Sequence, residues 1–382
     1  MKKILALTAV LAASVMLFTG CGTLMPSCGG ETVSSELLRD KPWSNPYNYE
    51  KTTYDLDRYA ATVNEDGSFT ANTDKLLASG TYVTEIEVAD RSIADWSGLG
   101  TLSEEVPGFS ERILGRVDEL TSSPSAYTVL RTTFELTYTD DADNSDRKGA
   151  TDRMESVVMI RNINMQPVFS YKHAELASSG IGYSAFADYL AGENVYSESK
   201  DGTATVTDRV TEIGTSYDNE ELFLLERAQS GIKEGVSATY SVHSAVETGV
   251  YGEEAVHTIA AAVTTDVADD PSDNYAYDKY GKDDASFIND YVGDAVAYYD
   301  AAEAGKKETE EGYSFPVNRA VFYRNETNMG TSTTVYYSDV DFNYFGMTTS
   351  NVMMYFATYE TNTEGEAVNM TVGEISDYTI VR

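Results

Sequence analysis

Apolar and polar residues alternate through most of the chain after residue 45. In 82–88, Ile86 and Val88 alternate with Glu85 and Glu87, the period of a strand that is buried on one face. About a dozen segments of this kind occur, namely 82–88, 134–138, 155–163, 168–173, 194–200, 203–209, 236–246, 255–263, 317–324, 331–338, 352–361, 366–372 and 377–382. So many strands predict one antiparallel sheet that is large enough to curl.

Turn signals indicate how neighbouring strands are joined. Asp201-Gly202 separates 194–200 from 203–209, and the left-handed backbone preference of this dipeptide suits a tight hairpin turn. An acidic tip at 140–149 precedes 155–163, which predicts the return strand of a longer hairpin.

Helical patterns are fewer. They predict helices at 109–120, where apolar residues form one stripe after Pro107, at 184–191, at 219–230 with Asp218 as N-cap, and at 284–304. Strands with scattered helices and no βαβ alternation predict the α+β class. We therefore expect a large curved antiparallel sheet, half-barrel-like, with a few covering helices.

The N-terminus carries the pattern of a secretory leader. Lys2 and Lys3 precede an apolar run at 4–18, and this run of 15 residues is shorter than a membrane-spanning helix needs. It ends in Thr19-Gly20-Cys21. The layout predicts a signal peptide that is removed.

The small–small–Cys ending resembles that of bacterial lipoproteins. The resemblance implies that Cys21 carries a thioether-linked diacylglycerol and that acyl chains such as palmitate hold the protein on the extracytoplasmic side of the cell membrane. An ordinary signal peptide, which would leave Cys21 unmodified, is the alternative. The expected organisation is a lipoprotein signal peptide at 1–20, a flexible tether at 21–45, and a single large β-rich domain at 46–382 with an acidic insert near 266–312.

The charge balance changes which partners are expected. The chain has 27 Lys and Arg against 62 Asp and Glu, a formal net charge of −35. Such a polyanion is repelled by nucleic acid, so a nucleic-acid partner is excluded. Two cysteines are present, and lipidation of Cys21 leaves Cys28 without a disulfide partner.

The sequence contains no recognised catalytic or metal-binding motif. The three histidines, His173, His243 and His257, lack metal-ligand spacing; we expect His243 to be solvated and His257 to be packed. Ser197 and Lys200 have the spacing of a serine–lysine pair, but they lie on a predicted strand and so point to opposite faces. We expect no cofactor and no enzyme activity, with a carboxylate-dependent envelope hydrolase as the remaining enzymatic alternative.

Two acidic segments are weak calcium candidates. Asp141 with Asp143, and Asp339 with Asp341, place carboxylates at alternate positions, as calcium loops do. Both segments lack the glycine and the later glutamate of an EF-type loop, so solvated acidic turns are the simpler interpretation. Weak calcium binding is the alternative.

Tyrosine is abundant, with 28 Tyr against 13 Phe. Tyrosine packs well on strand faces, and this interpretation is favoured over contact with a ligand or glycan.

Three segments resemble uncharacterised secreted bacterial proteins with a LolA-like half-barrel: 218–227 (DNEELFLLER), 235–242 (GVSATYSV) and 330–338 (GTSTTVYYS). The resemblance implies a curved sheet that is covered by helices on its concave side and that encloses apolar space, which sometimes holds lipid. It assigns no catalytic or ligand-binding residue. We expect a lipid-anchored surface protein that binds an apolar ligand or an envelope component. A surface adhesion module for glycans or proteins is the alternative.

Overall fold

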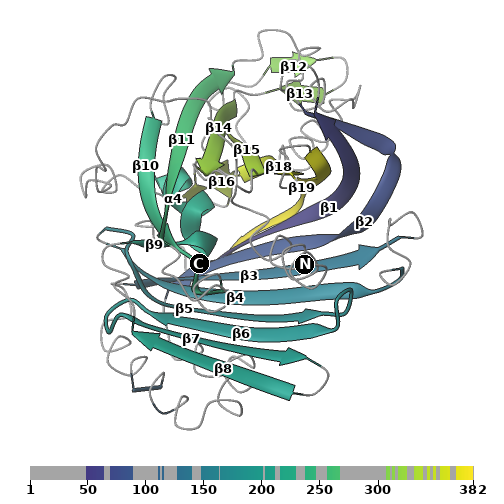
Figure 1. Ribbon diagram of the computed structural model, residues 1–382. Coiled ribbons are helices and arrows are strands. Elements are labelled where there is room, and N and C mark those ends of the chain that lie inside the picture. Colours follow the sequence, from purple (N-terminus) through teal and green to yellow (C-terminus); the bar gives the residue numbers. More distant parts are fainter. Residues whose placement is uncertain are drawn as a thin grey trace.

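One large sheet dominates the computed structural model of the protein (Figure 1). The structure describes residues 49–63, 69–88, 111, 114–115, 127–139, 148–162, 164–200, 203–210, 216–228, 237–246, 256–266, 307–309, 312–314, 317–324, 331–338, 342–344, 347–349, 353–361 and 367–381. Its elements are β1 (Tyr49–Val63), β2 (Phe69–Val88), β3 (Tyr127–Tyr138), β4 (Thr151–Arg161), β5 (Pro167–Leu176), β6 (Ile181–Asp188), β7 (Glu193–Lys200), β8 (Thr203–Val210), β9 (Tyr217–Asp218), η5 (Asn219–Glu221), α4 (Leu222–Ala228), β10 (Ser237–His243), β11 (Val256–Asp266), β12 (Lys307–Thr309), β13 (Gly312–Ser314), β14 (Val317–Arg324), β15 (Thr331–Ser338), β16 (Phe342–Tyr344), β17 (Met347–Thr349), β18 (Met353–Thr361) and β19 (Ala367–Val381).

The main sheet has 15 strands in the order β8-β7-β6-β5-β4-β3-β2-β1-β19-β18-β15-β14-β11-β10-β9. Strands β1 to β8 form an antiparallel meander, and β9 pairs with β10 in parallel. The first strand pairs with the last, with Tyr49 opposite Val381. The first and last described strands therefore lie side by side in the middle of the sheet, whereas the consecutive strands β8 and β9 form its two edges.

The sheet curves around η5 and α4 (Figure 1). Phe223 on α4 packs against Phe356 on β18, with ring centroids 5.8 Å apart. Glu220 on η5 forms an ion pair with Lys172 on β5. Since β5 and β18 lie on either side of the central β1–β19 pair, the helix is packed on the concave side of the sheet.

The expected α+β class is wrong, because the described residues are mostly strand and carry one short helix, α4, preceded by η5. The predicted antiparallel sheet is confirmed, and the predicted strands 317–324 and 331–338 coincide with β14 and β15. The expected helices at 109–120 and 284–304 lie outside the described residues, apart from three isolated positions near residue 113.

The helix expected at 184–191 is a strand instead. Residues 181–188 form β6, which pairs with β5 on one side and with β7 on the other. Its burial explains the misleading pattern, because side chains on both faces of β6 are buried and the apolar run does not alternate. A continuous apolar run cannot be assigned to helix or strand by periodicity alone.

Both faces of the sheet are also buried at β4. The neighbouring residues Val157, Val158, Met159 and Ile160 are all fully buried, although successive side chains point to opposite faces. Side chains on both faces of β4 are therefore shielded from solvent at this point. No helix in the described part of the chain is both long and apolar enough to cross a membrane.

Gly80 lies where β2 passes close to β3, and it provides a test of this packing. A Cβ at Gly80 would lie 1.8 Å from the carbonyl oxygen of Glu135, so one strand would have to shift. We expect Gly80→Ala to lower the free energy of unfolding by about 1–3 kcal/mol, measured by urea denaturation. Gly182→Ala is the control, since its Cβ would lie at an ordinary 3.6 Å from the carbonyl oxygen of Ala174. Equal losses in the two variants would contradict the prediction.

Candidate functional site

Most candidate site residues from the sequence cannot be compared with the structure. Cys21, Asp141, Asp143, Asp339 and Asp341 all lie outside the described residues. Within the described part of the chain, no three His, Cys, Asp or Glu side chains are grouped so that they could hold a metal ion.

The histidines differ from expectation at one position. His243 is fully buried at the end of β10, where its Nε2 lies 3.1 Å from Asn194 Oδ1 on β7, so the expectation that it is solvated is wrong. His173 is partly buried, with its Nδ1 3.0 Å from Ser184 Oγ. His257 lies on β11 opposite Val242, but its side chain is outside the described set.

Buried charges gather at residues 218–225, which we call the plug. Asp218, Glu220 and Glu221 are buried, and the apolar residues Leu222 and Leu225 that follow are fully buried. The plug contains the end of β9, all of η5 and the start of α4. Three carboxyl groups next to an apolar helical turn give this segment the character of a buried amphiphile.

Local sequence explains how the plug begins. Asp218 is extended, with φ −80° and ψ 145°, and its Oδ1 accepts a hydrogen bond of 2.9 Å from the backbone N–H of Glu220. Glu221 Oε1 in turn accepts a hydrogen bond of 2.8 Å from the backbone N–H of Asp218. This reciprocal capping box satisfies backbone donors that a helix start leaves open.

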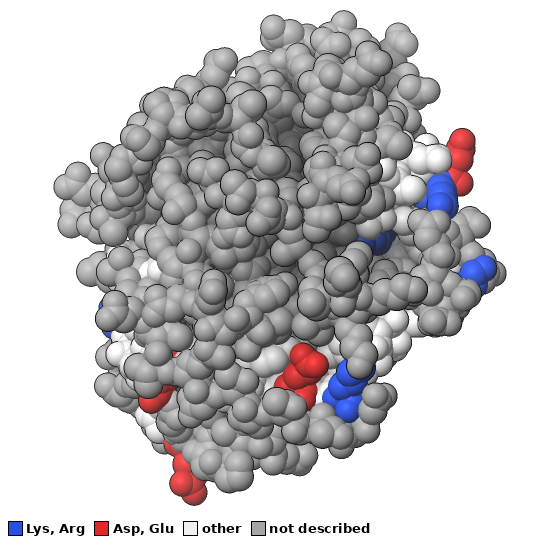
Figure 2. Space-filling view, viewed as in Figure 1, with Lys and Arg blue, Asp and Glu red and all other residues white. Residues whose placement is uncertain are grey.

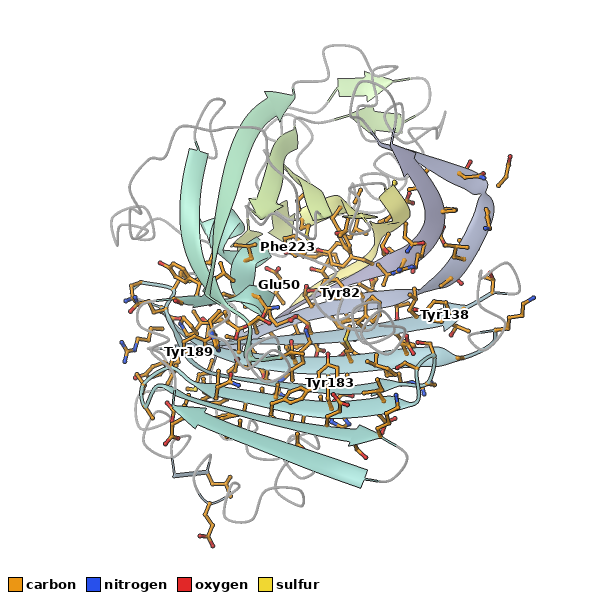
Figure 3. The ribbon with its side chains drawn as sticks, in the orientation of Figure 1. Glu50, Tyr82, Tyr138, Tyr183, Tyr189 and Phe223 are labelled. Atoms are coloured by element: carbon orange, nitrogen blue, oxygen red, sulfur yellow. The ribbon has the colours of Figure 1, made fainter. Side chains whose placement is uncertain are left out.

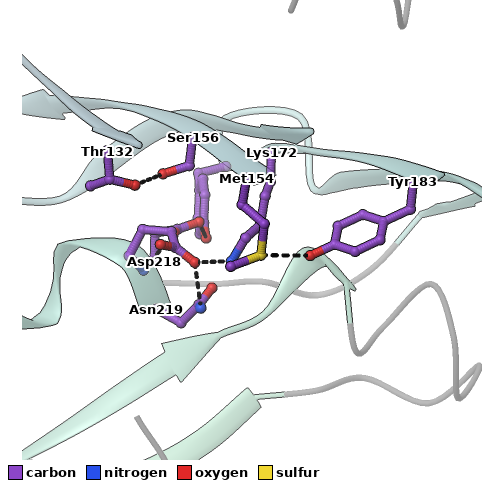
Figure 4. Close-up of polar contacts among 9 residues, drawn as sticks. Thr132, Met154, Ser156, Lys172, Tyr183, Asp218 and Asn219 are labelled. Carbon is purple, nitrogen blue, oxygen red and sulfur yellow. Dashed lines mark hydrogen bonds and ion pairs between the residues drawn. The ribbon is translucent and has the colours of Figure 1, made fainter. Parts of the chain in front are cut away.

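Lys172 binds the plug to the sheet (Figure 4). Its Nζ donates to Glu220 Oε1, and both side chains are nearly inaccessible to solvent. Burial is the largest single influence and lowers the pKa of Lys172, but Glu220, Tyr183 and Asp218 together outweigh burial and raise it. Asn219 Nδ2 donates to the same Glu220 oxygen at 3.0 Å. The ammonium group therefore stays charged, and the pair is a desolvated ion pair.

Asp218 is held in a second group of contacts. Tyr189 donates its hydroxyl to Asp218 Oδ2 at 2.7 Å, and Ser170 on β5 also hydrogen-bonds this carboxyl group. Burial, together with the charge of Glu220, raises the pKa of Asp218 to about 6 despite these bonds. Asp218 thus titrates near neutral pH.

Glu221 is the least satisfied group of the plug. Its side chain is fully buried, and burial raises the pKa of Glu221 well above its usual value. Its Oε1 caps the Asp218 N–H, but its Oε2 has no hydrogen-bond partner among the described residues. A buried polar atom of this kind costs about 1–3 kcal/mol, so the packed plug carries a free-energy cost.

The plug is also connected to the edge of the sheet through β10. Asn194 on β7 donates its Nδ2 to the carbonyl oxygen of Ala245 at 3.1 Å, besides its contact with His243. The His243 and Tyr189 rings meet edge to face, with centroids 5.8 Å apart. Side chains therefore join the β9–β10 edge to β5 and β7, where no backbone ladder is formed among the described residues.

The strand register places two rows of side chains under the plug. The first is a polar row of facing residues on β1 to β5: Thr52, Thr84, Thr132, Ser156 and Lys172. Directly opposed residues on adjacent strands lie on the same face. Thr132 and Ser156 hydrogen-bond each other (Figure 4), so the hydroxyl groups form a track that ends at the Lys172 ammonium.

The second row is aromatic and apolar. It runs beside the first and contains Tyr54, Tyr82, Phe134, Met154, Ala174 and Tyr183. Tyr54 and Tyr82 stack near Phe356, with ring centroids 5.7–5.9 Å apart, and Tyr183 lies beside Met154. Figure 3 shows Tyr82 beneath Phe223 of α4. The concave face thus combines an apolar row with a polar track that ends at Lys172. Two further charged residues of β1, Glu50 and Arg58, are buried on the same face as Thr52 and Tyr54.

The outer, convex face of β2 to β4 carries charged side chains, and some of them are exposed. Arg131 pairs with Glu87 at 2.9 Å, and Arg153 pairs with Glu135 at 2.8 Å. Figure 2 shows the few described charges that are visible from the side of Figure 1, and residues of both signs are among them.

The abundant tyrosines pack in the sheet. Those with described side chains are buried or partly buried, namely Tyr49, Tyr54, Tyr59, Tyr82, Tyr127, Tyr138, Tyr171, Tyr183, Tyr189, Tyr196, Tyr217 and Tyr378. The favoured interpretation, sheet packing, holds for these residues.

Sequence reasoning did not identify the plug as a site. Glu220 and Glu221 fit the first turn of the helix expected at 219–230, and Lys172 falls within the strand expected at 168–173. A lone lysine inside the run Val168–His173 was the available signal, because lysine is rarely buried without a partner.

The fold and the plug together define an antiparallel β protein with a helix packed on its concave face. No protein-family model matches the chain, and no curated protein matches it in sequence. Among solved structures, it is similar to the beta-barrel-like protein of domain of unknown function DUF1849 from Brucella abortus. That match has 9% sequence identity and a TM-score of 0.39, and it covers 88% of this chain and 100% of the other.

Proposed function

We propose that this chain is a lipid-anchored extracytoplasmic protein that binds an apolar ligand or an envelope component without catalysis. The leader at 1–20 and Cys21 support the anchor. The observation that carries the binding role is the aromatic and apolar row on the concave face. Beside it α4, a helix of only 7 residues, packs its Phe223 against Phe356. So short a helix is marginal by itself, so its position depends on its contacts with the sheet.

The buried tyrosines favour this role over surface adhesion. An adhesion module that uses tyrosine needs the rings in solvent, whereas Tyr54, Tyr82 and Tyr183 are inside. Their rings supply apolar surface toward the plug, and this surface suits hydrocarbon.

Ligand binding can be tested on the full chain after mild extraction from membranes. We expect native mass spectrometry to show the protein with a non-covalent apolar adduct, and we expect organic solvent to release that adduct. Lipid identification in the solvent extract would give its class. A chain that carries no adduct and takes up no added fatty acid or fatty alcohol would contradict the binding role.

The anchor makes a separate prediction. We expect the full chain to incorporate labelled palmitate and to fractionate with membranes, because two or more acyl chains hold a protein firmly in a bilayer. Cys21→Ala should abolish incorporation, and Cys28→Ala, which is the matched control, should leave it unchanged. Palmitate label that persists in Cys21→Ala would overturn the assignment of Cys21.

A further inference from the structure

We propose that the plug occupies the place of the ligand, and that this ligand is a single-chain amphiphile with an anionic head that replaces Glu220 at Lys172. This inference rests on the proposed binding function and specifies the chemistry of its ligand. The hydrocarbon chain would lie along the row of Tyr54, Tyr82 and Phe134, beside Phe356, against which Phe223 of α4 now packs.

The first step in the argument is the match between the plug and such a ligand. The plug presents the Glu220 carboxylate to Lys172 and, three residues later, the Phe223 ring to Phe356 of the sheet, with Leu222 fully buried between them in sequence. A fatty acid presents the same two features, a carboxylate and hydrocarbon. The plug is therefore a covalently attached mimic of that ligand.

The second step is the chemistry of the sheet beneath the plug. Ser156 faces Lys172 across β4 and β5, and Thr132 faces Ser156 across β3 and β4. An ammonium group flanked by hydroxyl groups binds an anionic head, since each can donate a hydrogen bond to a carboxylate or phosphate oxygen. A neutral head leaves the Lys172 charge buried without an anion, which is strongly unfavourable.

The third step is the cost of keeping the plug in place. Asp218, Glu220 and Glu221 bring three carboxyl groups to one buried ammonium, and Glu221 Oε2 has no partner among the described residues. An amphiphile brings one anionic group and no others. Exchange therefore returns two further carboxyl groups to water, and this gain offsets the loss of the α4 contacts.

The experiment uses the full chain in phosphatidylcholine nanodiscs and photoactivatable analogues of palmitate and of the matching fatty alcohol. Cross-linking is measured against concentration and mapped by mass spectrometry. We expect the palmitate analogue to cross-link to β1–β4 peptides at lower concentration than the alcohol. Glu220→Gln removes the competing charge but keeps the side-chain shape, so it should lower the half-saturating palmitate concentration about tenfold, the factor of a 1.4 kcal/mol change.

The paired variant Lys172→Met/Glu220→Gln is the control, because it removes the cation as well. It should bind the acid no better than the alcohol. If the parent and Glu220→Gln each bound the acid and the alcohol equally well, the proposal that the ligand has an anionic head would be overturned. The proposed apolar binding would still stand. Cross-links on the outer face of the sheet alone would overturn the position of the ligand. No cross-linking of either probe to any variant would instead contradict the proposed function itself.

Discussion

Lys172→Met should lower the free energy of unfolding by about 3–5 kcal/mol, because removing one partner leaves a buried charge uncompensated. The side chains of Lys172 and Glu220 are only 9% and 8% exposed, so water cannot replace the lost ammonium group in the folded protein. Urea denaturation followed by circular dichroism measures the loss.

Two further variants separate this effect from simple loss of packing. Lys172→Met/Glu220→Gln removes both charges, and it should recover most of the lost stability, because buried ion pairs are often replaceable by neutral residues. Arg153→Met breaks an ion pair whose partners are 58% and 45% exposed, and it should cost no more than about 1 kcal/mol. A double variant as unstable as Lys172→Met would show that the lysine matters through its packing.

The protein should become less stable as the pH rises from about 4 to about 6. Burial raises the pKa of Asp218 from 3.8 to about 6, so the folded state holds a proton that the unfolded state has already lost. Within that window the folded state binds more protons, and stability therefore falls with rising pH. A shift of about two pKa units corresponds to about 3 kcal/mol, all of which is lost above the folded pKa.

Asp218→Asn isolates this contribution from the other carboxyl groups. Asparagine keeps a side-chain oxygen for the Glu220 N–H and cannot ionise, so the variant should show a flatter slope between pH 4 and 6 than the parent. Asp55→Asn, at an exposed position on β1, should keep the parent slope. Unfolding free energies from urea titrations at several pH values provide the measurement. If the unfolding free energies of the parent and of Asp218→Asn changed in parallel with pH, the pH dependence would not originate from Asp218.

The parts of the fold that depend on local chemistry were predictable from the sequence. Asp218 was expected to cap a helix, and the structure shows the full capping box, because both of its partners lie within three residues. The hairpin at Asp201-Gly202 was expected for the same reason, and its flanking strands are β7 and β8.

Elements that depend on distant packing were not predictable. β1 is absent from the strands expected from the sequence, although it pairs with β2 on one side and with β19 on the other. The strands expected at 366–372 and 377–382 are one strand, β19, with a bulge where it passes Thr53 and Tyr54. The periodicity of apolar residues shows which face of a single segment is buried. Which strands pair, and where a strand ends, depends on the neighbouring strands in the sheet.

The candidate site was hidden for a related reason. Lys172 and Glu220 are 48 residues apart, and a first-turn glutamate is ordinarily explained by its position at the helix N-terminus. His243 was expected in solvent because it follows Thr239 and Ser241 on one strand face, but β9 and Asn194 enclose it. The burial of each group depends on a curved sheet, which no local pattern specifies.

The pairing of β1 with β19 has a consequence for how the protein is made. Tyr49 meets Val381, its partner 332 positions later, so the middle of the sheet cannot be completed until synthesis has reached the last strand. Contacts of such long range form slowly, and the exposed edges of β1 and β18, between which β19 inserts, are vulnerable to misassociation until then. A nascent chain with this topology has to be kept from aggregating over almost its entire length, and removal of even the final dozen residues should leave it dependent on chaperones.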